Sequence, residues 1–209
     1  MKTMMKRLFL PVLASAAVLI AGCGGVQTVS QVNESYLPSK HKRLAILPFE
    51  SKYADGRSMA DSFLPLFMSE GFVGVDRTLV SGALEAAAVL DPASITMEQL
   101  KKMKTAAGVD VVVMGSIDAK KPGTDIDAVS LRAVDSETGD VLISASFKNE
   151  KQIDSIQIPG QMLRVIRGKL RALAKRRLRD TRRAAKAEGK RLKKEAAAAA
   201  TAARDKAAL

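Results

Sequence analysis

Short apolar runs alternate with segments of helical periodicity through the middle of the chain, and this alternation limits the architectures open to it. The runs are rich in Val, Ile, Leu and Phe, which suit the pleated, half-buried surface of a strand. We expect five strands, at residues 44–49, 72–76, 109–114, 127–134 and 141–147. Between them, residues 59–67, 81–90 and 97–107 carry helical patterns. This order predicts an α/β sandwich in which helices pack on a mixed β-sheet of about five strands.

Start and stop signals locate the helix ends. Thr96 is a good N-cap for the helix that follows it, and Gly108 is a suitable stop. Gly71 is a plausible end for the first helix. Pro65 lies inside that helix and removes a backbone donor, so we expect it to kink or shorten the helix.

The last two strands form a predicted hairpin. Residues 127–134 alternate in polarity, and residues 141–147 return after a turn. The turn, Asp135–Asp140, contains Gly139 where a positive φ is expected. The strongest strand signal is Val109–Met114, a β-branched run suited to the middle of a sheet. We expect residues 115–126, which join it to the hairpin, to be a polar link.

Charge is distributed unevenly. The chain has 34 Lys and Arg against 22 Asp and Glu, for a net charge of +12. Residues 23–162 are mildly acidic, with 14 basic and 18 acidic side chains, whereas residues 163–209 hold 17 basic and four acidic ones. The globular part therefore lacks the basic surface of a nucleic-acid-binding domain, and we expect no nucleic-acid partner.

The C-terminal segment divides into a packed part and a basic part. Residues 161–178 repeat large apolar side chains at helical spacing and should pack on the sheet. Residues 179–209 consist mainly of Ala, Lys, Arg and Glu, which are strong helix formers, so a long basic helix should project from the domain. One interpretation is a solvated, low-complexity tail with no specific role. The other is an electrostatic arm for anionic lipid, peptidoglycan carboxylates or an acidic protein face. The candidate contact residues are Arg176, Arg177, Arg179, Arg182, Arg183, Lys186, Lys190, Arg191, Lys193 and Lys194.

The amino terminus has the pattern of a secretory signal. Residues 1–22 combine a basic start with an apolar stretch shorter than the roughly 20 residues of a membrane span. The stretch ends in Ile20, Ala21 and Gly22 directly before Cys23, the only cysteine. This arrangement resembles the lipobox of bacterial lipoproteins. The resemblance implies a lipoprotein signal peptide cleaved before Cys23, a diacylglycerol on its sulfur and an acyl chain such as palmitate on its new amine. Several chains on one residue give stable attachment where one would not. The alternative is an ordinary signal peptide or an uncleaved anchor.

The residues after Cys23 bear on location. In the enterobacterial lipoproteins that this pattern resembles, Asp at the next position implies retention in the inner membrane, so Gly24 favours the periplasmic face of the outer membrane. Residues 23–39 are expected to comprise the acylated cysteine and a polar tether. A tether of this length reaches roughly 20–50 Å, depending on extension.

Three motifs in the middle of the chain resemble one known family. Arg43–Phe49 (RLAILPF), Ala107–Gly115 (AGVDVVVMG) and Leu131–Leu142 (LRAVDSETGDVL) are similar in order and spacing to the motifs of the curli-secretion CsgG family. The same fold, resembling the amino-terminal domain of TolB, occurs in the peptidoglycan-synthase activator LpoB and the exopolysaccharide-export lipoprotein PelC. The match implies a CsgG/TolB-N-like α/β domain over residues 40–160.

The resemblance also implies a role. Members of the family are non-enzymatic outer-membrane lipoproteins that bind other envelope proteins, and some assemble into rings. The link at residues 115–126 is too short and polar for the membrane-inserting hairpins of pore-forming members. We therefore expect a subunit of an envelope export or assembly system without pore hairpins, with a homo-oligomer as one expected state. The alternative is an adaptor or activator that binds a periplasmic enzyme such as a peptidoglycan synthase. The short tether favours the assembly role.

No catalytic chemistry can be assembled from the sequence. His41 is the only histidine and lies among basic residues, so we expect it to be solvated. Cys23 is consumed by lipid in this interpretation, which leaves no thiol nucleophile. Asp125 and Asp127 lack the further ligands of a calcium loop. We expect no enzyme activity, no cofactor and no metal site.

Overall fold

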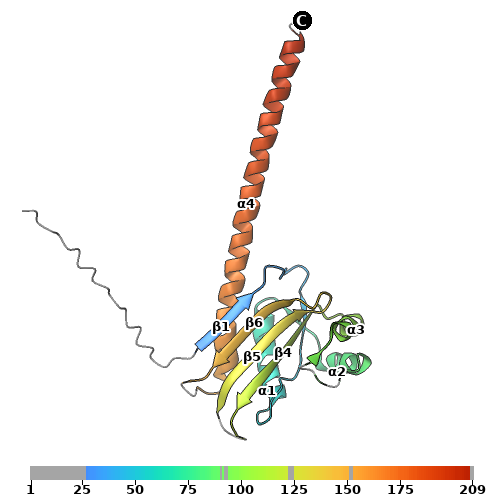
Figure 1. Cartoon of the computed structure of the whole chain (residues 1–209), viewed down its shortest axis with the longest axis vertical. Helices are drawn as coiled ribbons and strands as arrows, with labels where there is room; N and C mark the ends of the chain where they lie inside the picture. The colour runs from blue at the N-terminus through green and yellow to red at the C-terminus, as the bar shows by residue number, and fades with distance from the viewer. Residues whose placement is uncertain (1–26, 90, 92–93, 122–124, 151–152, 208–209) are drawn as a thin grey trace, which may run out of the picture.

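A six-stranded mixed sheet forms the centre of the computed structural model (Figure 1). The structure describes residues 27–89, 91, 94–121, 125–150 and 153–207. The strand order is β1-β6-β5-β4-β2-β3, with bounds β1 (Gln27–Val32), β2 (Arg43–Ile46), β3 (Val73–Gly74), β4 (Val111–Ala119), β5 (Ile126–Asp135) and β6 (Val141–Lys148). Strands β2, β3 and β4 run parallel, and β4, β5, β6 and β1 are antiparallel neighbours. The predicted α/β class and mixed sheet are confirmed.

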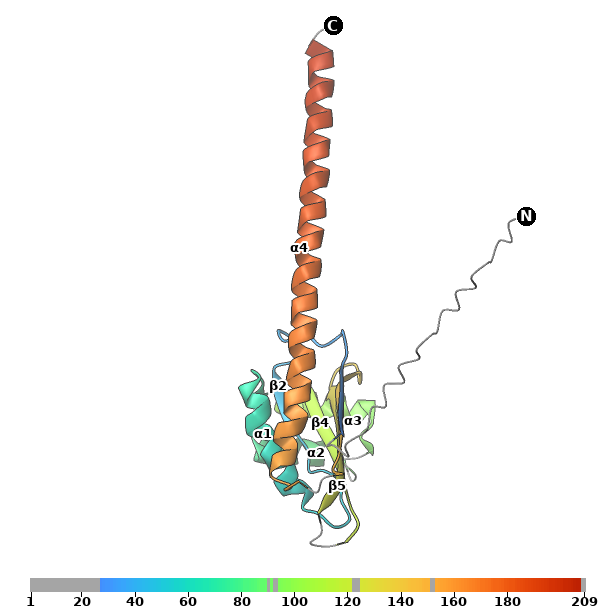
Figure 2. The same ribbon diagram turned by 90° about the vertical axis from the view of Figure 1, so that its left-hand side faces the viewer.

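Helices cover the two faces of the sheet unequally. Helix α1 (Gly56–Ser69) and the base of α4 (Gln157–Ala207) lie together on one face (Figure 2). Their core includes Phe63, Phe67, Met162 and Ile166. Helices α2 (Arg77–Ala86) and α3 (Met97–Ala107) enclose a second core against β2 and β4. In the part of the chain that the structure describes, no helix covers the β1, β6 and β5 half of that second face.

Strand β1 lies within the segment predicted to be a tether, residues 23–39, so that prediction is wrong for this part of the chain. It pairs antiparallel with β6 over its whole length, from Gln27 opposite Lys148 to Val32 opposite Ile143. Tyr36, a few residues later, is buried in the core. Residues 27–39 are thus part of the domain rather than a linker, and the sheet gains a sixth strand. The pattern was missed because the inward-facing positions include Thr28 and Ser30, which carry no hydrophobic signal.

The strand boundaries also differ from expectation around the polar link. Strand β4 continues to Ala119, and β5 begins at Ile126. Residues 115–119 and 126 are therefore strand, paired across β4 and β5 as far as Ala119 opposite Ile126. The hairpin between β5 and β6 is confirmed, and Gly139 has the expected positive φ of 76°.

Most of the predicted helix ends are confirmed. Thr96 caps α3 in a reciprocal capping box with Gln99, and Gly108 ends that helix in the left-handed region. Helix α1 runs without interruption through Pro65 from an Asp55 cap to Ser69, so the expected shortening is wrong. Its inner face, which includes Phe63 and Phe67, is held by tertiary packing that outweighs the lost donor.

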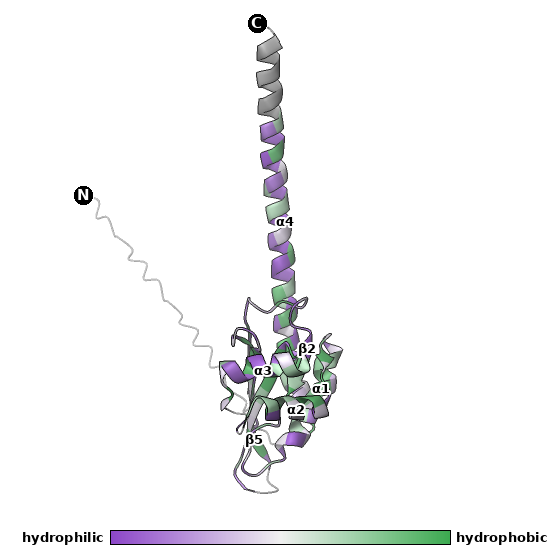
Figure 3. Cartoon of the chain, turned by 90° about the vertical axis from the view of Figure 1, so that its right-hand side faces the viewer, coloured by the Kyte–Doolittle hydropathy of each residue, from purple (hydrophilic) through white to green (hydrophobic). Residues whose placement is uncertain are grey.

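The C-terminal segment is one helix rather than two elements. α4 is continuous over 51 residues, and its base buries Ile158, Met162, Leu163 and Ile166. Every residue from Leu178 to Ala196 is exposed. At 1.5 Å per residue, the part beyond Leu178 extends about 45 Å from the domain. Figure 3 shows that hydrophilic residues dominate the part of this projection whose hydropathy is coloured.

We expect substitution of Gly115 by alanine to lower the free energy of unfolding by about 2 kcal/mol, because overpacked cores must shift to accommodate a methyl group. A Cβ there would lie 2.4 Å from the Ser130 carbonyl oxygen and 2.8 Å from the Phe49 ring. Gly168→Ala is the matched control, since nothing lies within 4 Å of its added Cβ. In α4 this control should raise stability by up to about 1 kcal/mol. Urea unfolding of both variants checks the prediction, and equal effects would contradict it.

Candidate functional site: the basic arm, the open sheet face and the anchor

The basic residues predicted as a contact surface fall into two groups. Arg176, Arg177 and Arg191 have partners. Arg176 pairs with Glu34 at 2.5 Å and also approaches Asp180, and the Arg177 guanidinium donates to the Glu34 carbonyl oxygen. Arg191 lies between Glu188 at 2.7 Å and Glu195 at 3.6 Å. Arg176 and Arg177 thus hold the helix to the loop after β1, which the sequence did not indicate.

The other seven residues have no such partners. They are Arg179, Arg182, Arg183, Lys186, Lys190, Lys193 and Lys194, all exposed. Within the described part of the chain, none of their side chains makes a hydrogen bond or an ion pair. Seven unpaired cations on one rod form a strongly positive surface available to an anionic partner.

A second candidate surface is the open half of the sheet, which the sequence analysis missed. Neighbouring strands align Val29, Ser146, Ser130 and Ser116 in one row across the sheet. The next row contains Gln31, Ser144, Arg132 and Met114. Because serine side chains are short, the rows line a shallow open hollow of about 570 Å³.

The hollow has a polar floor and an apolar margin. The Ser116 and Ser130 hydroxyls lie 2.8 Å apart across β4 and β5. Val29, on edge strand β1, is 60% exposed at its margin. Exposed β-strand edges and shallow faces of this kind offer backbone and hydroxyl groups to a protein partner. The sequence signal that could have found this surface is serine at alternate positions of β6, at Ser144 and Ser146.

The predicted anchor residues Ile20, Ala21, Gly22 and Cys23 lie outside the described residues. The first described element is β1. β1 starts at Gln27, so four Cα–Cα steps separate Cys23 from the sheet. An extended chain covers about 14 Å in four residues. Among the described residues, no helix is both apolar and long enough to cross a membrane.

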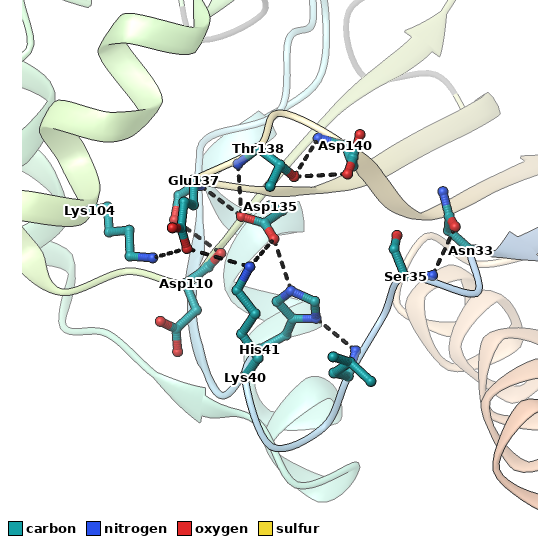
Figure 4. A network of polar contacts seen from close by, with 12 residues as sticks. Asn33, Ser35, Lys40, His41, Lys104, Asp110, Asp135, Glu137, Thr138 and Asp140 are labelled. Carbon is teal, nitrogen blue, oxygen red and sulfur yellow. Dashed lines mark hydrogen bonds and ion pairs between the residues drawn. The ribbon is translucent and has the colours of Figure 1, made fainter. Parts of the chain in front are cut away.

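A buried polar network fixes the loop that follows β1 (Figure 4). His41 is only 2% exposed, so the expectation that it is solvated is wrong. Its Nδ1 accepts a hydrogen bond from the Leu37 backbone N–H at 2.9 Å, and its Nε2 lies 3.0 Å from the Asp135 carboxylate. Both ring nitrogens are occupied in holding the chain, which is a structural role. The partner Asp135 lies 94 residues away, so no local pattern could have indicated it.

Asp135 is the centre of this network. Its carboxylate accepts backbone N–H bonds from Glu137 at 2.7 Å and Thr138 at 3.1 Å, and it approaches Lys40 at 3.3 Å. Burial raises the pKa of Asp135, but these bonds and the one from His41 outweigh burial and lower the pKa to about 2. The network therefore keeps a charged carboxylate at the turn between β5 and β6.

The described residues contain no group of three or more His, Cys, Asp or Glu side chains that could hold a metal ion. Asp125 and Asp127 are accordingly not joined by further acidic or histidine ligands there.

Comparisons with known proteins give distant likenesses. No protein-family model and no curated protein matches the chain. Among solved structures, a PelC dodecamer from Paraburkholderia phytofirmans is 13% identical with a TM-score of 0.44, covering 68% of this chain and 95% of that one. A lipoprotein from Neisseria meningitidis is 18% identical with a TM-score of 0.43, covering 61% and 95%. The LpoB C-terminal domain from Escherichia coli is 12% identical with a TM-score of 0.40, covering 51% and 81%.

Proposed function

We propose that this chain is a lipoprotein of the cell envelope, held by acylated Cys23 at the periplasmic face of the outer membrane. In this proposal it is a non-catalytic subunit of an export or assembly system of the CsgG type, without pore hairpins. The observation that carries the proposal is the start of β1 at Gln27. With a reach of about 14 Å between Cys23 and the sheet, the domain must work next to its membrane.

The open half of the sheet is the proposed docking site for a partner protein. Edge strand β1 offers its unpaired backbone groups, and the serine rows beside it leave room for a partner's side chains. Edge strands that are left open in this way tend to pair with another chain. The partner is another envelope protein or a second copy of this chain.

An adaptor that activates a periplasmic enzyme such as a peptidoglycan synthase is the second candidate. The projection of α4 favours it, because an arm of about 45 Å could carry contacts away from an anchored domain. The short link to Cys23 disfavours it, since the domain itself cannot travel far from the membrane.

Light scattering of the detergent-extracted, full-length lipoprotein separates the two candidates. The assembly role predicts a large, discrete oligomer, because an edge strand and an open sheet face provide a repeating contact. A monomer would contradict the assembly role and favour the adaptor. Mass spectrometry of the same sample reports on the acyl chains at Cys23, and an unmodified cysteine would refute the lipid anchor.

A further inference from the structure

We infer that one face of α4 is a docking stripe for anionic phospholipid headgroups, so that the arm lies along the membrane that holds Cys23. This inference rests on the proposed lipid anchor and adds a second, electrostatic contact to it. The stripe consists of the seven unpaired basic residues Arg179, Arg182, Arg183, Lys186, Lys190, Lys193 and Lys194.

The first argument is the segregation of charge around the helix. At 100° per residue, the seven residues fall within an arc of about 120°, and no acidic residue falls inside it. Asp180, Glu188 and Glu195 lie on the remaining surface. Arg191 lies on that surface too and is paired with Glu188 and Glu195. Between residues 178 and 196, the cation outside this arc is paired and those within it are unpaired.

The second argument is the direction of the stripe. The residues that pack α4 onto the domain, among them Met162, Ile166 and Leu173, centre about 130° away from the middle of the stripe on the helical wheel. The stripe therefore faces away from the sheet. Arg164 and Lys175, both exposed, continue the same side of α4 over the domain. A flat charged surface can contact this side without meeting the rest of the protein.

The third argument is proximity to the anchor. The base of α4 packs on β1, whose first residue Gln27 lies within about 14 Å of Cys23 along an extended chain. The acyl chains therefore bring the base of the helix close to the headgroups. A rotation of the anchored domain would then bring the stripe onto the headgroups.

The composition of the stripe favours anionic lipid over a binding pocket on another protein. It contains no large apolar side chain, and Leu178 and Leu192, both about half exposed, lie outside it. A row of cations over about 23 Å of straight helix matches a surface of uniform charge. Near an anionic membrane, each basic residue strengthens association by about five-fold, and the effect decays within a Debye length.

The test uses the full-length acylated protein in vesicles of phosphatidylcholine, alone or mixed with phosphatidylglycerol. With the Cys23 sulfur acylated, a fluorophore on Ala196→Cys would report the distance of the arm from acceptor-labelled headgroups by energy transfer. We expect strong transfer only when phosphatidylglycerol is present, and its loss in high salt. Equal energy transfer in both kinds of vesicle would overturn the inference. An acidic protein would then be the better candidate partner for the stripe.

An exchange variant separates the stripe from total charge. Arg183→Ala with Ala184→Arg, and Lys186→Ala with Ala185→Lys, move two cations off the stripe while preserving composition. Docking should weaken by about 25-fold. Arg191→Gln, outside the stripe, removes a charge that is already paired and should leave docking nearly unchanged. If the exchange variant docked on the vesicles as strongly as the wild type, the stripe would have no specific role in docking.

Failure of the anchor would appear separately in the same experiment. A protein that does not float with vesicles of phosphatidylcholine alone lacks the acyl anchor, whatever the stripe does. Energy transfer that depends on phosphatidylglycerol then still decides whether the stripe binds anionic lipid.

Discussion

Replacement of Asp135 by alanine should lower the free energy of unfolding by about 3 kcal/mol, because it leaves several buried donors without an acceptor. The backbone N–H groups of Glu137 and Thr138 and the His41 ring all donate to this carboxylate, whose side chain is 5% exposed. Urea unfolding measures the effect. Glu137→Ala is the matched control, since Glu137 pairs with Lys40 and Lys104 at the surface. An exposed pair contributes at most about 1 kcal/mol. A similar loss for both variants would contradict the buried network.

The same substitution should change the response to acid. The folded-state pKa of Asp135 is about 2, below the ordinary value of 3.8. A depressed pKa adds stability above the unfolded value, and that stability is lost as pH falls from about 4 toward 2. The wild type should therefore lose stability more steeply than Asp135→Ala over this range. Parallel slopes for the two proteins would show that Asp135 is not held in its charged form.

Replacement of Ile166 by alanine should destabilise the domain by about 3 kcal/mol, because it opens a cavity in a packed core. Ile166 is fully buried between α4 and the sheet. Leu178→Ala removes a similar aliphatic side chain from the same helix where it is 53% exposed. This control should change stability by no more than about 0.5 kcal/mol. Thermal and urea unfolding of the two variants provide the comparison.

A shortened chain tests where the domain ends. Removal of residues 179–209 takes away the exposed part of α4 and should leave the unfolding free energy nearly unchanged. A large loss of stability on this truncation, or equal effects of Ile166→Ala and Leu178→Ala, would mean that domain and arm do not divide near residue 178.

The sequence was informative where local pattern and tertiary role agree. The β-branched run that includes Val111–Val113 lies in the middle of the sheet, and the Thr96 and Gly108 signals mark the ends of α3. The basic arm could be predicted because helix formers without large apolar residues can be recognised by composition alone. Composition alone does not indicate which side of α4 packs on the domain. That side determines the direction in which the basic stripe faces.

The features that escaped prediction depend on distant partners. β1 is held by backbone pairing with β6 and by contact with α4, while its inward Ser30 keeps a buried hydroxyl without a partner among the described residues. A strand whose inward-facing positions are polar cannot be recognised from the periodicity of its hydrophobic residues. His41 looked solvated because its sequence neighbours are basic, yet it is buried against Tyr36 and Asp135. The open sheet face likewise exists only once four strands are aligned.

The course of β1 and α4 has a mechanical consequence. β1 enters the sheet at Gln27, and α4 runs alongside it in the same direction and leaves the domain past Glu34 (Figure 1). Tension between the start of β1 and the far end of α4 would slide β1 lengthwise against β6. The six residue pairs of that ladder would then share the load at once instead of opening one after another. The domain is therefore built to transmit pulling force along this axis and to yield more readily to force applied across it.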